Sequence, residues 1–293
     1  MAAENLLAAR GVTEQMRLGI LQGVAKIHKP TAELRSLRES VLLQGGLAAE
    51  PCVFERALLL RAVMRSLDRI PQLPVEDSVK HLFCKEFMFY ANPPEKDLHK
   101  FVYTCHPFLT MVKLALLLRF PAGLLQWEVS GLSRRLLLDL PPTQMPRTLY
   151  FLAMKARAFH PYFEPHIAVS SLTVAFLSER EFLKSFYRMA ASLEKQPTIR
   201  GILDASWLHS SETHRVSPHL AFVSRPYLES GGLYADVGPA AADSGFLAGD
   251  KNRWNLYQSG QYKPTRALVI CTREQALAWK CKHSQLESKL GVR

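Results

Sequence analysis

Apolar residues recur at helical spacing through the first half of the chain. In Glu50–Arg69 they return every three or four residues, and Asp77–Tyr90 shows the same period before the prolines that follow it. This spacing predicts amphipathic helices with one buried face each. Three further segments have enough apolar or helix-forming residues to extend the pattern: 95–101, 109–118 and 148–159.

One stretch of the first half has the period of a strand. Leu125, Trp127 and Val129 alternate with polar residues after a turn at Pro121 and Gly123. We interpret the intervening Glu128 as a solvent-facing strand residue. The predicted first region is therefore 1–157, mainly helical with one strand pair near 119–138, and the second region is 158–293.

The second region alternates strand and helix signals. An apolar run at Ile167–Leu177 predicts a strand, and a capping box at Ser178 and Glu181 starts a helix to Lys195. Another capping box, at Thr272 and Gln275, starts the last helix. Strands are predicted from residue type at 199–208, 219–224, 233–237 and 265–271, with a short helix at 250–259.

The order strand, helix, three-strand meander, short helix, strand, helix resembles the GNAT acyltransferase fold over roughly the last 125 residues. The GNAT sheet splays open to admit the pantetheine arm of its thioester. The resemblance implies an α+β protein, with a helical N-terminal half packed on a GNAT-like mixed β-sheet with flanking helices. It also implies transfer of an acyl group from a coenzyme A or carrier-protein thioester to an amine.

The resemblance places a phosphate-binding loop at 238–253. GNAT enzymes usually carry Arg/Gln-x-x-Gly-x-Gly/Ala there, and this chain lacks that spacing. Its small residues and its two cations at a helix start are the expected cofactor contacts, because a helix N-terminus attracts anions. The predicted cofactor-binding residues are Ser244, Gly245, Lys251 and Arg253.

Several stretches also resemble an uncharacterised group of bacterial proteins, for which no established activity supplies a mechanism. They are Arg119–Gly123, Trp127–Gly131, His160–His166, Ser206–Trp207, Ser217–Ala221 and Tyr257–Tyr262.

His160, Tyr162, Glu164 and His166 have even spacing, so an extended chain places them on one face. Two imidazoles and a carboxylate can hold a divalent metal, which makes His160, Glu164 and His166 a candidate metal triad. Alternatively, His160 or Glu164 acts in proton transfer. The flanking prolines favour an edge or irregular segment.

The acyltransferase hypothesis assigns further roles near the predicted strands. His219 or Glu164 is the general base, and Tyr257 or Tyr262 protonates the leaving group. Arg253 and Tyr257 are four residues apart and share a helical face. A Ser–His–acid triad can also be drawn from Ser217, His219 and Asp204 or Glu212, although no Gly-x-Ser-x-Gly elbow supports it.

The charge and composition of the chain indicate which partners it binds. The chain has 37 Lys+Arg against 26 Asp+Glu, a formal net charge of +11, which favours an acidic small molecule or an acidic carrier protein as partner. Nucleic acid is disfavoured, because basic and aromatic residues do not interleave in a stacking motif. No apolar run is long enough to span a bilayer. A non-catalytic module that binds an acidic partner through a basic face is therefore a third hypothesis.

Five cysteines without a CxxC pair fit a reducing compartment, and we expect a cytoplasmic protein. Cys271 ends a predicted strand and is the one cysteine considered as a reactive thiol, with a role as a small core residue favoured.

Overall fold

The computed structural model describes residues 51–102, 106–157, 160–168, 177–240 and 250–289. These residues form two compact units. One unit contains the described residues up to Leu73 together with Lys80–Phe120, and the other contains Pro74–Val79 and the described residues from Pro121 onward. The boundary predicted at 157/158 falls within the second unit. The α+β class is confirmed.

The first unit is helical, as the apolar period predicts. Its principal helices are α4 (Pro51–Ser66), most of α5 (Asp77–Ala91) and α6 (His106–Ala115). The 3-10 segments η2 (Leu67–Gln72) and η3 (Glu95–Phe101) follow α4 and α5. The core is rich in phenylalanine, because Phe83, Phe87, Phe101 and Phe108 are all buried.

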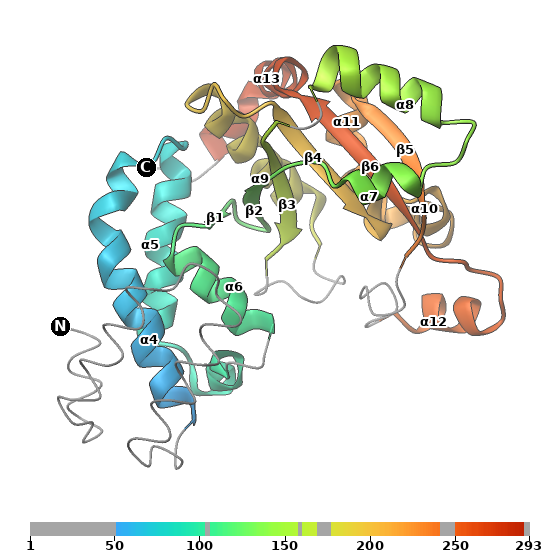
Figure 1. Ribbon diagram of the computed structural model, residues 1–293. Helices are drawn as coiled ribbons and strands as arrows, with labels where there is room; N and C mark the ends of the chain where they lie inside the picture. The colour runs from blue at the N-terminus through green and yellow to red at the C-terminus, as the bar shows by residue number, and fades with distance from the viewer. Residues whose placement is uncertain (1–50, 103–105, 158–159, 169–176, 241–249, 290–293) are drawn as a thin grey trace. The chain divides into compact units, whose positions relative to one another are not determined.

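The second unit is built on a mixed sheet of strand order β1-β2-β3-β4-β6-β5 (Figure 1). The chain passes from the first unit to the second within β1 (Arg119–Pro121). Neighbours are antiparallel for β2 with β3, β4 with β6, and β5 with β6, while β3 and β4 are parallel. The bounds are Leu125–Ser130 for β2, Tyr162–Ile167 for β3, Gly201–Ser206 for β4, Leu233–Pro239 for β5 and Thr265–Thr272 for β6.

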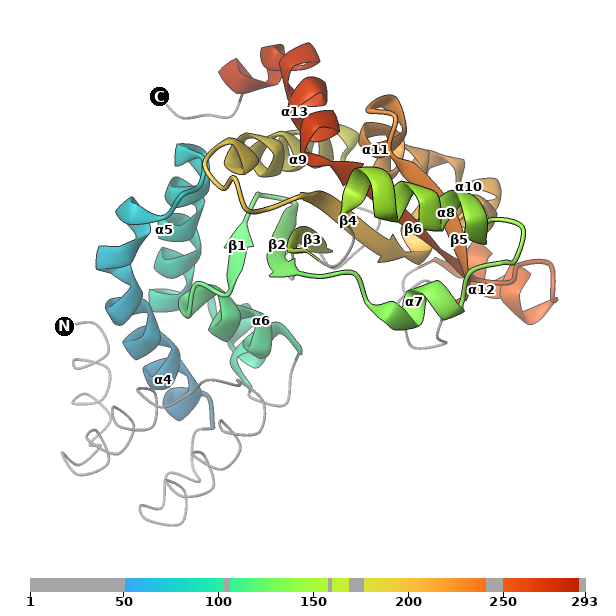
Figure 2. The same cartoon turned by 45° about the horizontal axis from the view of Figure 1, so that its top comes forward.

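Helices cover both faces of this sheet (Figures 1 and 2). On one face lie α9 (Glu179–Glu194), α11 (Arg225–Glu229) and α13 (Arg273–Lys282), where the Phe186 ring lies 5.1 Å from Tyr227 and 5.0 Å from Trp279. On the other lie α7 (Arg134–Leu138), α8 (Met145–Phe151) and the π-helical η4 (Leu152–Ala156), which bury a core against the strands.

The remaining elements connect or follow the strands. They are η7 (Trp207–His209), α10 (Ser211–Val216), η8 (Pro218–Val223), α12 (Lys251–Gln258) and η9 (Ser284–Lys289). Within the described ranges, none of the helices combines the length and the apolar character that crossing a membrane requires.

The parallel strands β3 and β4 separate soon after they meet. Their register has one Cα pair, Phe163 with Ile202, although each strand is six residues long. Ala168 donates its N–H to the Leu124 carbonyl on the β2 side (2.9 Å). Because peptide groups alternate sides along a strand, the nitrogen of Pro165 faces β4, and proline has no N–H to donate there. Pro165 therefore stops the β3–β4 ladder.

This position corrects the interpretation of the His160–His166 segment as an edge. Pro165 lies in an interior strand, opposite Trp127 on β2. A proline is tolerated there because the β4 side of β3 is unpaired past Phe163.

One predicted strand is wrong in type. The first described strand of the second region is Tyr162–Ile167, and most of the predicted strand Ile167–Leu177 lies outside the described residues. The segment His219–Ser224 is not a strand, because Pro218–Val223 forms the 3-10 helix η8. Pro218 occupies the first turn, where its fixed φ suits a helix and its missing N–H costs nothing.

The capping boxes have different outcomes. At Thr272 the box is complete, because the hydroxyl accepts from Gln275 N and the Gln275 side chain accepts from Thr272 N. Ser178 is the N-cap of α9, as predicted, but its side chain makes no capping hydrogen bond. The end of α9 at Glu194 agrees with the predicted helix within one residue.

Gly201 starts β4 at a point where no side chain fits. Its φ is +152°, and a Cβ there would lie 2.1 Å from the Cys271 carbonyl oxygen on β6. We expect Gly201→Ala to lower the free energy of unfolding by about 2 kcal/mol, because the β4–β6 backbone must shift to admit a methyl group. Urea unfolding measures this loss. Gly131→Ala is the control, since nothing lies within 4 Å of a Cβ at Gly131. Equal stability of the two variants would contradict the close approach of β6 to Gly201.

Candidate functional site

A cavity of about 710 Å³ opens on the α7 and α8 face of the second unit, beside the strands that separate. It begins where the core ends, because polar or small residues lie two positions from core residues on the same strand faces. Core members Tyr162, Leu203 and Leu268 are thus neighbours of Glu164, Ala205 and Arg266. The full lining is Ser133, Arg135, Leu136, Asp139, Glu164, Ala205, Pro239, Ala240 and Arg266.

Glu164 on β3 contributes a carboxylate to this cavity. Among the described residues that the sequence predicted as site residues, Glu164 lines it. Glu128 is its partner across the β2–β3 ladder, and Gln126 is the partner of His166. Directly opposed residues of an antiparallel pair share a face, so these polar side chains stand beside the cavity wall.

Glu128 is half-buried rather than solvent-facing. Its Oε1 lies 3.9 Å from His166 Nε2, so the two side chains form an ion pair when the imidazole is protonated. The alternation in 125–130 identifies the strand but not its β3 neighbour, and that neighbour determines what Glu128 faces.

Two arginines from different elements balance the carboxylates of the cavity. Arg266 on β6 donates from Nη2 to Asp139 Oδ2 (3.0 Å) and to the Val237 carbonyl (3.4 Å). Its buried Nε has no hydrogen-bond partner among the described residues. Arg135 is exposed on α7. Sequence reasoning did not single out either arginine, because only the folded sheet brings α7 and β6 together.

Arg253, predicted as a phosphate contact, is a buried structural charge. Its Nη1 lies 2.8 Å from Asp250 Oδ2 and donates to Ser217 Oγ (3.0 Å), and its Cζ lies 5.3 Å from the Trp207 ring centre. Only 1% of Arg253 is exposed. Burial lowers the pKa of Arg253, while Asp250 opposes that shift.

Of the other predicted cofactor contacts, Lys251 does not line the cavity. Lys251 is exposed at the first position of α12. Ser244 and Gly245 lie outside the described residues.

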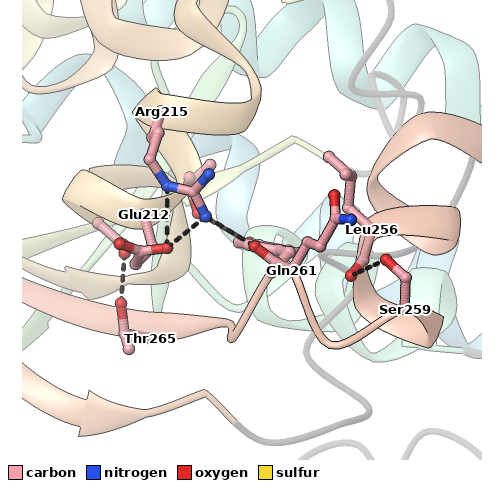
Figure 3. Close-up of polar contacts among 9 residues, drawn as sticks. Glu212, Arg215, Leu256, Ser259, Gln261 and Thr265 are labelled. Carbon is pink, nitrogen blue, oxygen red and sulfur yellow. Dashed lines mark hydrogen bonds and ion pairs between the residues drawn. The ribbon is translucent and has the colours of Figure 1, made fainter.

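A side-chain hydrogen bond connects α10 to the segment after α12 (Figure 3). Arg215 donates from Nη2 to Glu212 Oε2 (2.8 Å) and to the Gln261 carbonyl (2.8 Å). Ser259 Oγ donates to the Leu256 carbonyl at the end of α12 (3.1 Å). Glu212 therefore has a local structural partner.

The remaining predicted catalytic residues do not line the cavity. His160 and His219 are exposed, in the segment before β3 and in η8 respectively. Tyr257 is exposed on α12 beside Trp254. The Tyr262 hydroxyl is buried 3.0 Å from Thr213 Oγ1, and burial raises the pKa of Tyr262.

A Ser–His–acid chain exists, and it shares only the acid, Asp204, with the triad proposed from the sequence. His209 Nε2 lies 2.9 Å from Asp204 Oδ2, and its Nδ1 lies 2.9 Å from Ser224 Oγ. Ser217 instead accepts from Arg253. His209 and Ser224 are each 1% exposed. A hydroxyl this enclosed meets no substrate, so the chain of hydrogen bonds holds η7 to the start of α11.

Among the described residues, no three His, Cys, Asp or Glu side chains gather as metal ligands. The triad of His160, Glu164 and His166 stays a prediction that metal analysis of the purified protein tests. Cys271 is enclosed on β6, and burial raises its pKa to about 12 while Ser230 partly opposes the shift. This thiol is neutral at pH 7, as a core residue requires.

No model of a known protein family matches this chain, and no curated protein matches it. Among solved structures, it is similar to an acyltransferase in complex with decanoyl-CoA and teicoplanin, with a TM-score of 0.40 and 12% identity. It is also similar to an acyltransferase in complex with decanoyl-CoA, with a TM-score of 0.40 and 13% identity. Each comparison covers 92% of this chain and 99% of the other. These structural neighbours are acyltransferases that bind acyl-CoA.

Proposed function

We propose that this protein is an acyltransferase that moves an acyl group from a thioester of coenzyme A or a carrier protein to an amine. The observation that carries the proposal is the separation of β3 from β4 past Phe163 and Ile202, beside a cavity that contains Glu164. The GNAT fold uses a splayed sheet to admit a pantetheine arm, and the unpaired side of β3 at Pro165 supports the same use here.

The backbone of β3 provides a reason for binding an extended arm. Past Phe163 its peptide groups on the β4 side are free of the ladder, and an amide-containing chain can pair with such groups as an added strand does. Leu136 and Ala205 bring apolar surface to the same cavity, which suits the acyl group.

Glu164 is the general base in this proposal. The amine nitrogen attacks the thioester carbonyl carbon, a C–N bond forms, and the C–S bond breaks. Glu164 accepts the proton that the amine loses. The thiol leaves as a thiolate, and because a thiol pKa is about 8.5 it needs little help from an acid at neutral pH.

Ligand binding and product formation test the proposal together. We expect acetyl-CoA or decanoyl-CoA to raise the midpoint of thermal unfolding, because a ligand bound by the folded state alone stabilises it. A carrier protein loaded with the same acyl groups is the second donor. Mass spectrometry then detects acylated amine and free thiol in equal amounts. No stabilisation and no product with either donor would leave the non-catalytic binding module as the better account.

A further inference from the structure

The charges of the cavity indicate what kind of amine is acylated. Arg135 and Arg266 contribute two positive charges, and Asp139 and Glu164 contribute two negative charges. A balanced site of this kind favours a ligand that carries both signs over a polyanion, because each ligand charge then meets its opposite. Coenzyme A phosphates therefore fit this cavity poorly.

Arg135 and Arg266 both line the cavity, and Arg266 already pairs with Asp139 there. Arg266 uses Nη2 for Asp139 and Val237, and its buried Nε has no partner among the described residues. Arg135 is exposed on α7 at the same cavity. A carboxylate that accepts hydrogen bonds from guanidinium groups is held strongly, since both partners are charged.

Apart from Ser133, apolar residues form the rest of the wall. Leu136 and Ala205 pack against the core cluster, and Pro239 and Ala240 line the cavity as well. These residues offer no hydrogen-bonding side chain, so the part of the ligand beyond its charged groups is expected to be apolar.

We propose that the acyl acceptor is a free amino acid with an apolar side chain, its carboxylate held by Arg135 and Arg266 and its amino group placed at Glu164. This inference rests on the proposed function, because it names the amine of that reaction. The amino group then lies beside the carboxylate that accepts its proton.

Three small probes test the acceptor without any thioester: L-leucine, L-leucinamide, which lacks the carboxylate, and N-acetyl-L-leucine, which lacks the free amine. Calorimetric titration of the full chain at pH 7 measures each affinity. We expect leucine to bind at least about tenfold more tightly than either analogue, the usual effect of losing one charge-assisted contact. Equal affinity for leucine and leucinamide would overturn the inference.

Variants locate the two contacts. We expect the preference for leucine over leucinamide to fall in Arg135→Gln and in Arg266→Lys. We expect the preference for leucine over N-acetyl-leucine to fall in Glu164→Gln. Arg147→Gln is the charge-matched control, because Arg147 is exposed on α8 and does not line the cavity. If neither arginine variant changes the preference, the carboxylate is bound elsewhere and the inference is wrong.

The inference about the acceptor and the proposed function can be disproved independently of each other. If leucine binds as described but no acyl group reaches it from either donor, the proposed function is wrong and the amino acid site stands. If leucinamide and leucine are acylated equally well, the proposed function stands and the amino acid inference is wrong.

Discussion

Glu164→Gln is expected to lower kcat/KM for acyl transfer by about 10²- to 10⁴-fold, the usual contribution of a positioned general base. The amide keeps nearly the size and shape of the side chain but does not accept the amine proton. Glu164 lines the cavity from β3 and is half-buried there. Initial rates with a saturating acyl donor measure the loss, and we expect it in kcat while the affinity for the donor stays within about threefold.

A second carboxylate gives the matched control. Glu194 is exposed at the end of α9, outside the cavity, where it pairs with Lys280 (2.7 Å). Glu194→Gln removes the same charge and is expected to leave kcat/KM within about twofold. Wild-type turnover by Glu164→Gln, with its fold intact by urea unfolding, would remove Glu164 from the mechanism.

Arg253→Ala is expected to lower the free energy of unfolding by about 2–3 kcal/mol, because it removes a buried side chain together with its hydrogen bonds and leaves the partly exposed Asp250 without its ion pair. The substitution removes the partner of Asp250 and the donor to Ser217, and it takes a cation from the Trp207 ring. Arg253→Lys should recover part of the loss, because it keeps the charge but not the planar fork. Urea unfolding of both variants measures these differences.

Lys251→Ala is the comparison, since Lys251 is exposed on the same helix. We expect its stability to stay within about 0.5 kcal/mol of the wild type. The phosphate contact predicted from the sequence requires a different outcome: unchanged stability in Arg253→Lys together with a lower affinity for coenzyme A. That outcome would reverse the structural assignment of Arg253.

The sequence predicted elements where one face of a helix or strand is buried. The helix predicted from Ser178 to Lys195 and the one predicted from Thr272 both start at local capping signals, and both correspond to observed helices. His219–Ser224 has strand-forming residues, but Pro218 starts a 3-10 helix there. Residue type alone does not determine the backbone when neighbouring elements pack over a short segment.

The candidate site was partly predictable. Even spacing placed Glu164 on a strand face, and the structure adds that this face is beside a cavity. Arg135, Asp139 and Arg266 carry no motif, and they meet because α7 covers the end of the sheet near β6. Arg253 lies near the start of a helix, a position that predicted phosphate binding. In the structure the N-cap residue Asp250 forms an ion pair with it.

Acyl transfer by this protein requires the separated strands β3 and β4 to receive the thioester arm. A crystal structure with a non-cleavable acyl-CoA, in which a methylene group separates the carbonyl from sulfur, shows whether they do. We predict the arm beside β3 past Phe163, with the acyl carbonyl in the cavity beside Glu164. Binding of the analogue elsewhere, with β3 and β4 paired along their whole length, would show that these strands do not receive the arm.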